Sequence, residues 1–176
     1  MRRVLRARTA WTRAAIVLAV VLVADQVTKA IVRADVRVGS EDPVLPFVSI
    51  VHVRNRGIAF SFLEDRTAIV IAFIALAIVA LLWWFARHAT TPWAWLPVGL
   101  LAGGAVGNVV DRLRLGAVTD FVKLPAWPAF NVADSAITVG VIALVLAIEA
   151  AARRRERAEQ AATTSGEGSR GAADVA

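Results

Sequence analysis

The sequence contains no cysteine and only two histidines. Without cysteine there are no disulfides, no thiolate nucleophiles and no cysteine-based metal sites. His52 and His88 are far apart in the sequence and lack the spacing of a metal-ligand pair. Acid–base chemistry in this chain is therefore expected to depend on carboxylates.

Charged residues are missing from long parts of the chain. None occurs in residues 67–86 or 89–110, and none in 135–148, after which the apolar pattern continues to Ala152. A membrane-spanning helix needs about twenty predominantly apolar residues. Together with 58% hydrophobic residues and a mean hydropathy of +0.63, these runs predict an integral membrane protein without a separate soluble domain.

The apolar runs predict four transmembrane helices, at about residues 11–32, 67–86, 93–110 and 131–152. Residues 1–152 would then form a single membrane-embedded domain. The tail, 153–176, is charged and then rich in Ser, Gly, Ala and Thr, a composition typical of disorder. The N-terminal arginines and the following apolar run also resemble a secretory signal peptide. That run continues past Asp25 and Lys29 to Val32, however, which favours a retained first helix.

The net charge of +6 indicates orientation rather than nucleic-acid binding. The arginines cluster near the two chain ends, as the positive-inside rule would place them beside cytoplasmic ends of helices. With four spans, both termini are predicted to be cytoplasmic and the two longer loops to face outward. In the first outer loop, residues 48–53 and 58–62 have strand-like composition on either side of a predicted turn at 54–57. A small sheet on the membrane surface is expected there.

Several polar residues interrupt or border the apolar runs. Asp25 and Lys29 share one helix face, either as a mutually neutralising pair with a snorkelling lysine or as a brace for a site. Gly103 and Gly107 form a GxxxG step, which indicates close helix packing. Asn108, with its buried amide, would either bind a peptide backbone or hold a neighbouring helix.

The last two helices have polar ends of their own. Asp111 and Arg112 are adjacent, so separate partners are more natural than an ion pair, and Asp111 is expected to organise loop backbone. Asn131 is a candidate N-cap with Asp134 three residues later. The free amides and positive dipole end of a helix start would also help to keep Asp134 ionised.

Asp120 and Asp134 are the strongest candidates for acid–base chemistry. Carboxylates near hydrocarbon are costly, and Pro125 and Pro128 between the two would let the chain turn back and bring them together. Two close carboxylates share a proton, so one can deprotonate water while the other polarises a carbonyl, as in aspartic proteases. The alternative is a proton or cation relay in a small transporter. Four short spans without an internal repeat make this alternative weaker.

Five blocks of this sequence resemble the bacterial lipoprotein signal peptidase (signal peptidase II) family, over roughly residues 14–152. In order, the matching blocks are Asp25-Gln-Val-Thr-Lys29, Asn55-Arg-Gly-Ile-Ala-Phe60, Gly103-Gly-Ala-Val-Gly-Asn-Val-Val-Asp-Arg112, Gly116-Ala-Val-Thr-Asp-Phe121 and Pro128-Ala-Phe-Asn-Val-Ala-Asp-Ser135. The combination is specific, whereas a single block would be a weak signal.

The resemblance implies an all-α membrane protein with four transmembrane helices and a small extracytoplasmic β-sheet cradle. It implies an aspartic endopeptidase of the bacterial cytoplasmic membrane that cleaves diacylglyceryl-modified prolipoproteins just before the lipidated cysteine. Asp120 and Asp134 would be the catalytic pair. Substrate-binding or site-organising roles would fall to Asn55, Asn108, Arg112 and Asn131, and structural support to Asp25, Lys29, Gly57, Gly104, Gly107 and Asp111.

The resemblance also sets expectations about partners. No metal or organic cofactor is needed, the partners would be prolipoproteins and membrane lipids rather than nucleic acid, and the protein is expected to be monomeric. Two features depart from the family pattern. The segment between Asp120 and Asp134 is compact, which implies a shorter flap over the site than in some relatives. The tail after Arg157 matches nothing in the family core and is expected to have no catalytic role.

Overall fold

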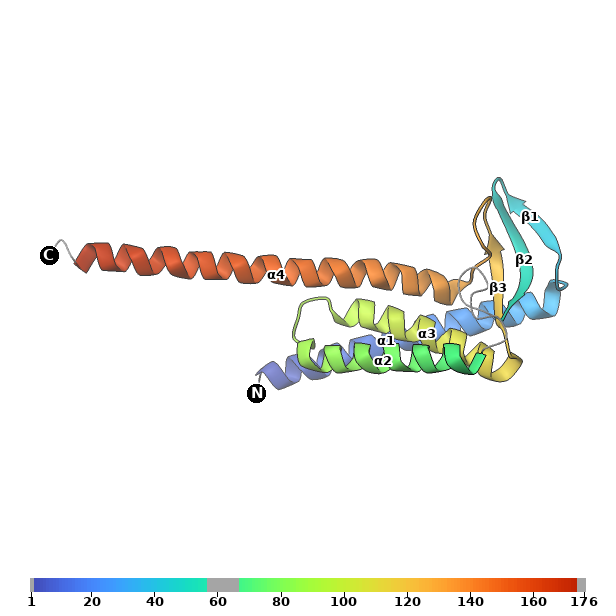
Figure 1. The fold of residues 1–176 in the computed structure, drawn as a ribbon, viewed down its shortest axis with the longest axis horizontal. Helices are drawn as coiled ribbons and strands as arrows, with labels where there is room; N and C mark the ends of the chain where they lie inside the picture. The colour runs from blue at the N-terminus through green and yellow to red at the C-terminus, as the bar shows by residue number, and fades with distance from the viewer. Residues whose placement is uncertain (1, 57–66, 174–176) are drawn as a thin grey trace.

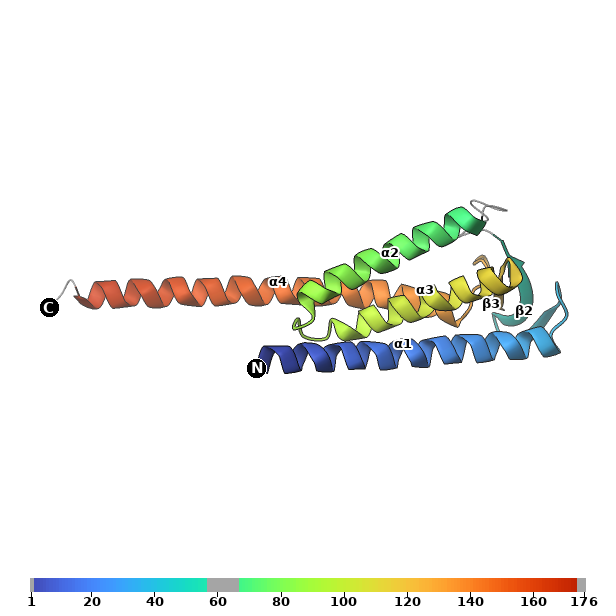
Figure 2. The ribbon, with the colours of Figure 1, turned by 90° about the horizontal axis from the view of Figure 1, so that it is seen from below.

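The structure is a computed structural model that describes residues 2–56 and 67–173. Its elements follow one another as α1 (Arg2–Asp35), β1 (Glu41–Leu45), β2 (Val48–Asn55), α2 (Thr67–His88), α3 (Trp95–Leu115), β3 (Val118–Lys123) and α4 (Val132–Ala173). The helices run side by side, the strands lie at one end of the bundle, and both chain termini point toward the other end (Figures 1 and 2). The fold is therefore mostly helical with one small sheet.

Helix α3 is the centre of the bundle, because it packs extensively against α1 and α4 and also against α2. Its small residues allow this. A methyl group added at Gly103 would lie 2.9 Å from the carbonyl oxygen of Leu18 in α1, and one at Gly104 would lie 2.5 Å from the carbonyl oxygen of Ala133 in α4. The close helix packing predicted from the glycine step is confirmed, and it sets α1 and α4 directly against the central helix.

Three helical segments are long and apolar enough to cross a membrane: Val4–Asp35, Ala68–His88 and Val132–Ala158. Large apolar side chains on their outer surfaces are exposed, for example Phe73, Leu76 and Val145. An apolar surface of this extent suits contact with lipid rather than with water. Helix α3 is not among the three, because its glycines, Asn108 and the Asp111–Arg112 pair lower its hydropathy.

The C-terminal tail differs from the sequence-based prediction. Residues 153–176 were expected to be disordered, whereas α4 continues without a break to Ala173 and extends well past the other helices (Figure 1). The first part of this extension is rich in Ala, Arg, Glu and Gln, which are good helix formers. Arg153 also forms an ion pair with Glu149 one turn earlier, which supports a helix at this point.

The sheet has the antiparallel order β1-β2-β3. The predicted strand at 48–53 is confirmed within β2, but its neighbours in the sheet are β1 and β3, neither of which was predicted. Arg54 and Asn55 were assigned to a turn and instead end β2, because β3 pairs with them through Thr119 and Val118. The second predicted strand, 58–62, lies outside the described residues, as does Gly57.

The chain reaches β3 through a tight turn at the end of α3. Gly116 has a left-handed backbone, with φ of 69°, and its N–H donates to the carbonyl oxygen of Arg112. Glycine is the residue that adopts this conformation without steric cost, and it commonly ends helices in this way. The turn sends the chain back across the end of the bundle, so that Asp120 in β3 lies over the helices.

Candidate active site

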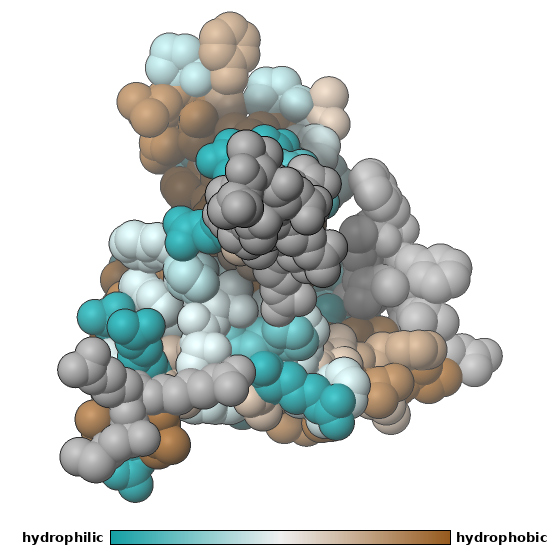
Figure 3. All heavy atoms as spheres, turned by 90° about the vertical axis from the view of Figure 1, so that its left-hand side faces the viewer, coloured by the Kyte–Doolittle hydropathy of each residue, from teal (hydrophilic) through white to brown (hydrophobic). Residues whose placement is uncertain are grey.

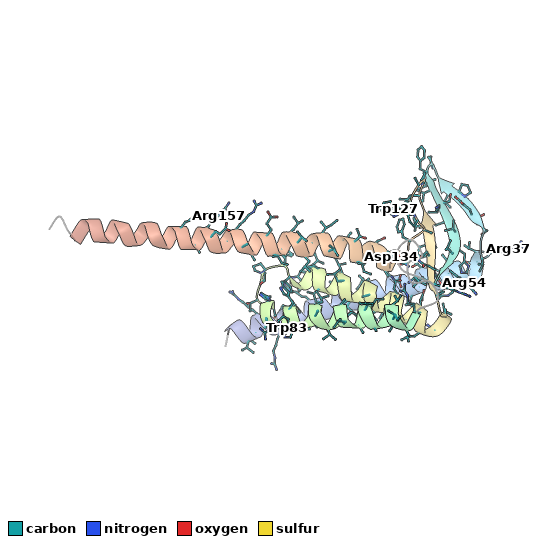
Figure 4. All side chains as sticks on the ribbon, in the orientation of Figure 1. Arg37, Arg54, Trp83, Trp127, Asp134 and Arg157 are labelled. Carbon is teal, nitrogen blue, oxygen red and sulfur yellow. The ribbon has the colours of Figure 1, made fainter. Side chains whose placement is uncertain are left out.

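A short return of the chain brings the segment after β3 back onto β3. The backbone N–H of Phe130 donates to the carbonyl oxygen of Val122 over 3.0 Å, and the N–H of Val122 donates back to Phe130 over 2.8 Å. Asn131 then lies beside Asp120, with 2.7 Å between its side-chain nitrogen and the Asp120 Oδ1. The expectation that residues 121–130 turn back is confirmed. Asp134, one helical turn further on, lies where the helices meet the sheet (Figure 4).

Asparagine amides connect the two carboxylates. Asn55 Nδ2 donates to Asp120 Oδ2 over 3.0 Å, and Asn108 Nδ2 donates to Asp134 Oδ1 over 2.8 Å. Asn131 Nδ2 donates both to Asp120 and, over 3.2 Å, to the amide oxygen of Asn108. A chain of hydrogen bonds therefore runs from Asp120 through Asn131 and Asn108 to Asp134. Five of the predicted site residues, Asn55 among them, meet at this one place.

Asn131 and Asp134 also start helix α4. The Asn131 Oδ1 accepts a hydrogen bond from the Asp134 N–H over 2.9 Å, and the Asp134 Oδ2 accepts one from the Asn131 N–H over 3.2 Å. This reciprocal pair is a capping box, which satisfies two N–H groups at the helix start. The predicted cap is confirmed, and it holds the Asp134 carboxylate in place without removing it from the amide chain.

A buried charge cluster, formed by Asp25, Lys29 and Asp111, contacts the asparagine chain at Asn108. Lys29 Nζ lies 2.8 Å from Asp25 Oδ2 and 3.4 Å from Asp111 Oδ2, and it donates to Asn108 Oδ1 over 2.9 Å. Asp25 Oδ1 accepts from the N–H of Ala133 over 2.9 Å. The predicted Asp25–Lys29 pair is confirmed, but Lys29 is fully buried and does not snorkel. The Lys29 ammonium has several buried polar partners. Moving it to the membrane surface would leave these partners unpaired, at a cost in free energy.

Asp111 and Arg112 have separate partners, as predicted. Asp111 Oδ2 accepts from the backbone N–H of Thr119 over 3.0 Å, so it organises the start of β3. Arg112 is buried, donates to the carbonyl oxygen of Asn108 over 3.3 Å, and lies within electrostatic range of Asp134, Asp120 and Asp111. A positive charge so close to these carboxylates offsets part of their mutual repulsion.

Three residues of this cluster were not predicted. Gln26 donates from Nε2 to Asp25, Asp111 and the carbonyl oxygen of Gly107, and Arg33 contacts Asp111 and the Thr119 hydroxyl. Thr119 is 2% exposed and joins β3 to α1 and α3. Gln26 and Thr119 are adjacent to Asp25 and Asp120 inside the matched blocks, which is the one signal that pointed to them.

The pKa of Asp120 is higher than that of an ordinary aspartate. Burial, at 2% exposure, raises the pKa of Asp120 from 3.8 to about 7, and the negative charge of Asp134 acts in the same direction. The amides of Asn55 and Asn131 and the charge of Lys29 lower it, but they do not outweigh the loss of water. Near neutral pH this side chain is therefore present in both its protonated and its ionised form.

The raised pKa of Asp120 predicts how stability depends on pH. The folded state holds the Asp120 proton more tightly than the unfolded state does. The contribution of Asp120 to the free energy of unfolding is therefore fully present below about pH 4 and is lost as pH rises through about 7. Asp120→Asn should remove that loss, worth up to roughly 4 kcal/mol because a tenfold change in proton affinity equals about 1.4 kcal/mol. Unfolding followed by tryptophan fluorescence between pH 4 and 8 measures it. An unchanged pH slope in the variant would contradict the assignment.

The arrangement as a whole defines a class of protein. Its carboxylates are buried or half-buried, joined by amides and placed at the end of an apolar helix bundle. Carboxylates in such a place are candidates for acid–base chemistry beside a membrane. In residues 2–56 and 67–173, no three histidine, cysteine or acidic side chains are placed to hold a metal ion. The class is thus a membrane-embedded protein whose candidate reactive groups are aspartates.

The chain belongs to the signal peptidase II family, whose family model, "Signal peptidase (SPase) II", matches residues 17–149. The lipoprotein signal peptidase of Geobacter metallireducens is 42% identical over 151 residues, covering 81% of this chain and 93% of its own. That of Dehalococcoides mccartyi is 38% identical, covering 71% and 81%. That of an Azoarcus species is 47% identical over 131 residues, covering 70% and 74%.

A solved structure has the same fold. A bacterial membrane enzyme determined by the in meso method at 2.3 Å resolution aligns with a TM-score of 0.73 and 31% identity. The alignment covers 77% of this chain and 86% of that one. The family resemblance found in the sequence blocks is therefore confirmed by sequence relatives and by the fold.

Proposed function

We propose that this protein is an aspartic endopeptidase that removes signal peptides from diacylglyceryl-modified prolipoproteins, cleaving just before the lipidated cysteine. Membership of the family supports the substrate class. The continuous chain of amide hydrogen bonds between Asp120 and Asp134 supports the reaction type. A water molecule between an ionised and a protonated carboxylate can be deprotonated by the first while the second donates a proton. No metal or organic cofactor takes part in this proposal.

The two carboxylates differ in their surroundings, and this difference suggests their roles. Asp120 is almost completely buried and keeps its proton up to about pH 7, so it is the proposed acid that polarises the scissile carbonyl. Asp134 is partly exposed and can reach water, so it is the proposed base. After attack, the proton taken by Asp134 passes to the leaving amine and the peptide bond breaks.

The asparagines and Arg112 have supporting roles in this reaction. Asn55, Asn108 and Asn131 fix the carboxylate oxygens through hydrogen bonds, and any of their amide groups freed on substrate binding would pair with the peptide backbone. Arg112 supplies positive charge while the tetrahedral oxyanion forms. The Asp25–Lys29–Asp111 cluster keeps Asn108 and the start of β3 in position.

The proposed membrane arrangement has α1, α2, α3 and α4 as four spans, with the sheet and the two aspartates on the extracytoplasmic side. Arginines at both chain ends support cytoplasmic termini. In the turn between β1 and β2, Phe47 is 79% exposed, and Trp127 in the loop after β3 is also exposed. Exposed aromatics of this kind suit the membrane–water interface. A substrate anchored by its acyl chains could then reach the site without leaving the bilayer.

A matched pair of substrates tests the proposal. The purified protein, reconstituted in liposomes, is given a synthetic prolipoprotein peptide with or without diacylglycerol on its cysteine. We expect cleavage of the lipidated peptide only, at the bond before the cysteine, identified by mass spectrometry. Equal cleavage of both peptides would reject the substrate class. Proton flux across the liposome membrane without any cleavage would instead favour the transporter alternative.

A further inference from the structure

A groove on the opposite end of the molecule is separate from the candidate active site. It lies between the connection from α2 to α3 and one face of α4, and has a volume of about 260 Å³. Its walls include Thr91 and Trp93 on one side and Ala143, Ala147, Ala151 and Arg154 on the other. Arg154 and Asp134 are separated by about 30 Å along α4, at about 1.5 Å for each residue. The groove therefore has no part in the chemistry of the aspartates.

The shape of the groove fits a chain rather than a compact molecule. Drug-sized ligands occupy enclosed pockets of about 300–1,000 Å³, whereas this groove is smaller and open along the helix. From Ala143 to Arg154 it follows one face of α4 for about 16 Å, close to half of the roughly 30 Å hydrocarbon core of a bilayer. One acyl chain of a single leaflet has this length and this apolar character.

The polar groups of the groove are at the end nearer the chain termini. Arg154 is exposed and, among the described residues, forms no hydrogen bond or ion pair. Two arginines near the groove have partners already: Arg153 pairs with Glu149, and Arg87 lies 4.2 Å from the ring of Trp83. Figure 3 shows hydrophilic side chains gathered on this end of the molecule. A free guanidinium at the mouth of an apolar groove complements a phosphate.

Trp93 marks the level of the headgroups. Its indole is 66% exposed, and its backbone has a φ of 66°, a left-handed conformation that costs a non-glycine residue energy. Tryptophan is enriched where lipid headgroups meet hydrocarbon. Trp93, Thr91 and Arg154 line the same groove as the alanines of α4.

We propose that this groove binds one anionic phospholipid, with an acyl chain along Ala143, Ala147 and Ala151 and the phosphate on Arg154. The negative charge distinguishes this ligand from a zwitterionic lipid, whose own cation competes for the phosphate. Basic pockets between membrane helices bind anionic headgroups by the same physics. The site is independent of the proposed protease activity, because it rests on the opposite end of the bundle.

Native mass spectrometry of the full chain in detergent tests the site, with phosphatidylglycerol and phosphatidylcholine of identical acyl chains as probes. We expect wild type to bind phosphatidylglycerol about tenfold more tightly, the size of one charge-assisted contact. Arg154→Gln should abolish the preference. Arg153→Gln removes the same charge one residue away and should keep it. Ala147→Phe should fill the groove and weaken the binding of both lipids.

Several results would overturn the site. These are equal binding of both lipids by wild type, an equal loss in Arg153→Gln and Arg154→Gln, and full binding by Ala147→Phe. Glycerol 3-phosphate serves as a probe of the headgroup alone, and binding as tight as that of phosphatidylglycerol would show that the groove contributes nothing. Tryptophan fluorescence during thermal unfolding checks that each variant is folded, so that a loss of binding reports on the groove.

Discussion

Asp120→Asn and Asp134→Asn should each lower the cleavage of a lipidated prolipoprotein by about a thousandfold or more, within the range expected when an acid or base is lost. An amide cannot accept the proton from water, nor can it donate one to the leaving amine as a carboxylic acid does. Asn55 and Asn131 donate to different oxygens of Asp120. The single amide oxygen of the variant can keep one of these hydrogen bonds, and rotation of the Asn55 amide can restore the other with its direction reversed. Both variants should therefore fold and insert, as measured by thermal unfolding of the purified protein.

Two other acids are the controls for this experiment. Asp42→Asn changes an exposed carboxylate of β1 and should cleave like wild type. Asp111→Asn changes a buried carboxylate that holds Lys29 and the N–H of Thr119, so it should lower the unfolding temperature and retain measurable cleavage. The proposed pair is wrong if a folded Asp120→Asn or Asp134→Asn protein cleaves near the wild-type rate. It is also wrong if folded Asp111→Asn protein has no activity.

Lys29→Met should destabilise the protein by about 3–5 kcal/mol, the cost of removing one partner from a buried ion pair. Lys29 is fully buried between Asp25 and Asp111. Without its positive charge these carboxylates would remain buried and repel each other. Methionine is close to lysine in length and flexibility, so lost packing is a small part of the effect. The unfolding free energy in detergent, followed by the fluorescence of the six tryptophans, measures it.

Two further variants test whether charge, rather than packing, causes the loss of stability in Lys29→Met. Arg33 also lies near Asp111, at 3.7 Å, but its side chain is 26% exposed, so Arg33→Met should cost about 1 kcal/mol or less. Asp25→Asn combined with Lys29→Met should be more stable than Lys29→Met alone, because one uncompensated charge is removed. Wild-type stability of the single variant, or an additive loss in the double variant, would show that the cluster is not held together by charge.

Local patterns predicted much of the candidate site. The Asp25–Lys29 pair depends on helical spacing, and the Asn131–Asp134 cap depends on residues three apart, so both follow from short stretches of sequence. The close approach of α3 to its neighbours follows from its glycines in the same way. These predictions were confirmed because the interactions that decide them are nearly independent of the rest of the fold.

Interactions between distant segments account for the features that the sequence did not predict. β3 is a strand because it pairs with β2, which lies far away along the chain, and its own residues give a weak pattern. Thr119 matters because Asp111 and Arg33 reach it from two helices. The composition of the tail indicated disorder. In the structure α4 continues into the tail, because the first tail residues are good helix formers that follow a helix already formed. Span number and membrane orientation remain predictions.

The return from Phe130 to Val122 also determines which part of this site can vary in length. The backbone pairing between Val122 and Phe130 closes the loop at residues 124–129, so the positions of Asp120, Asn131 and Asp134 depend on that pairing and not on the loop itself. Doubling a flexible loop costs only about 0.6 kcal/mol in closure entropy. The length of this loop can therefore change at little cost, while the few residues from Phe130 to Asp134 must keep their spacing.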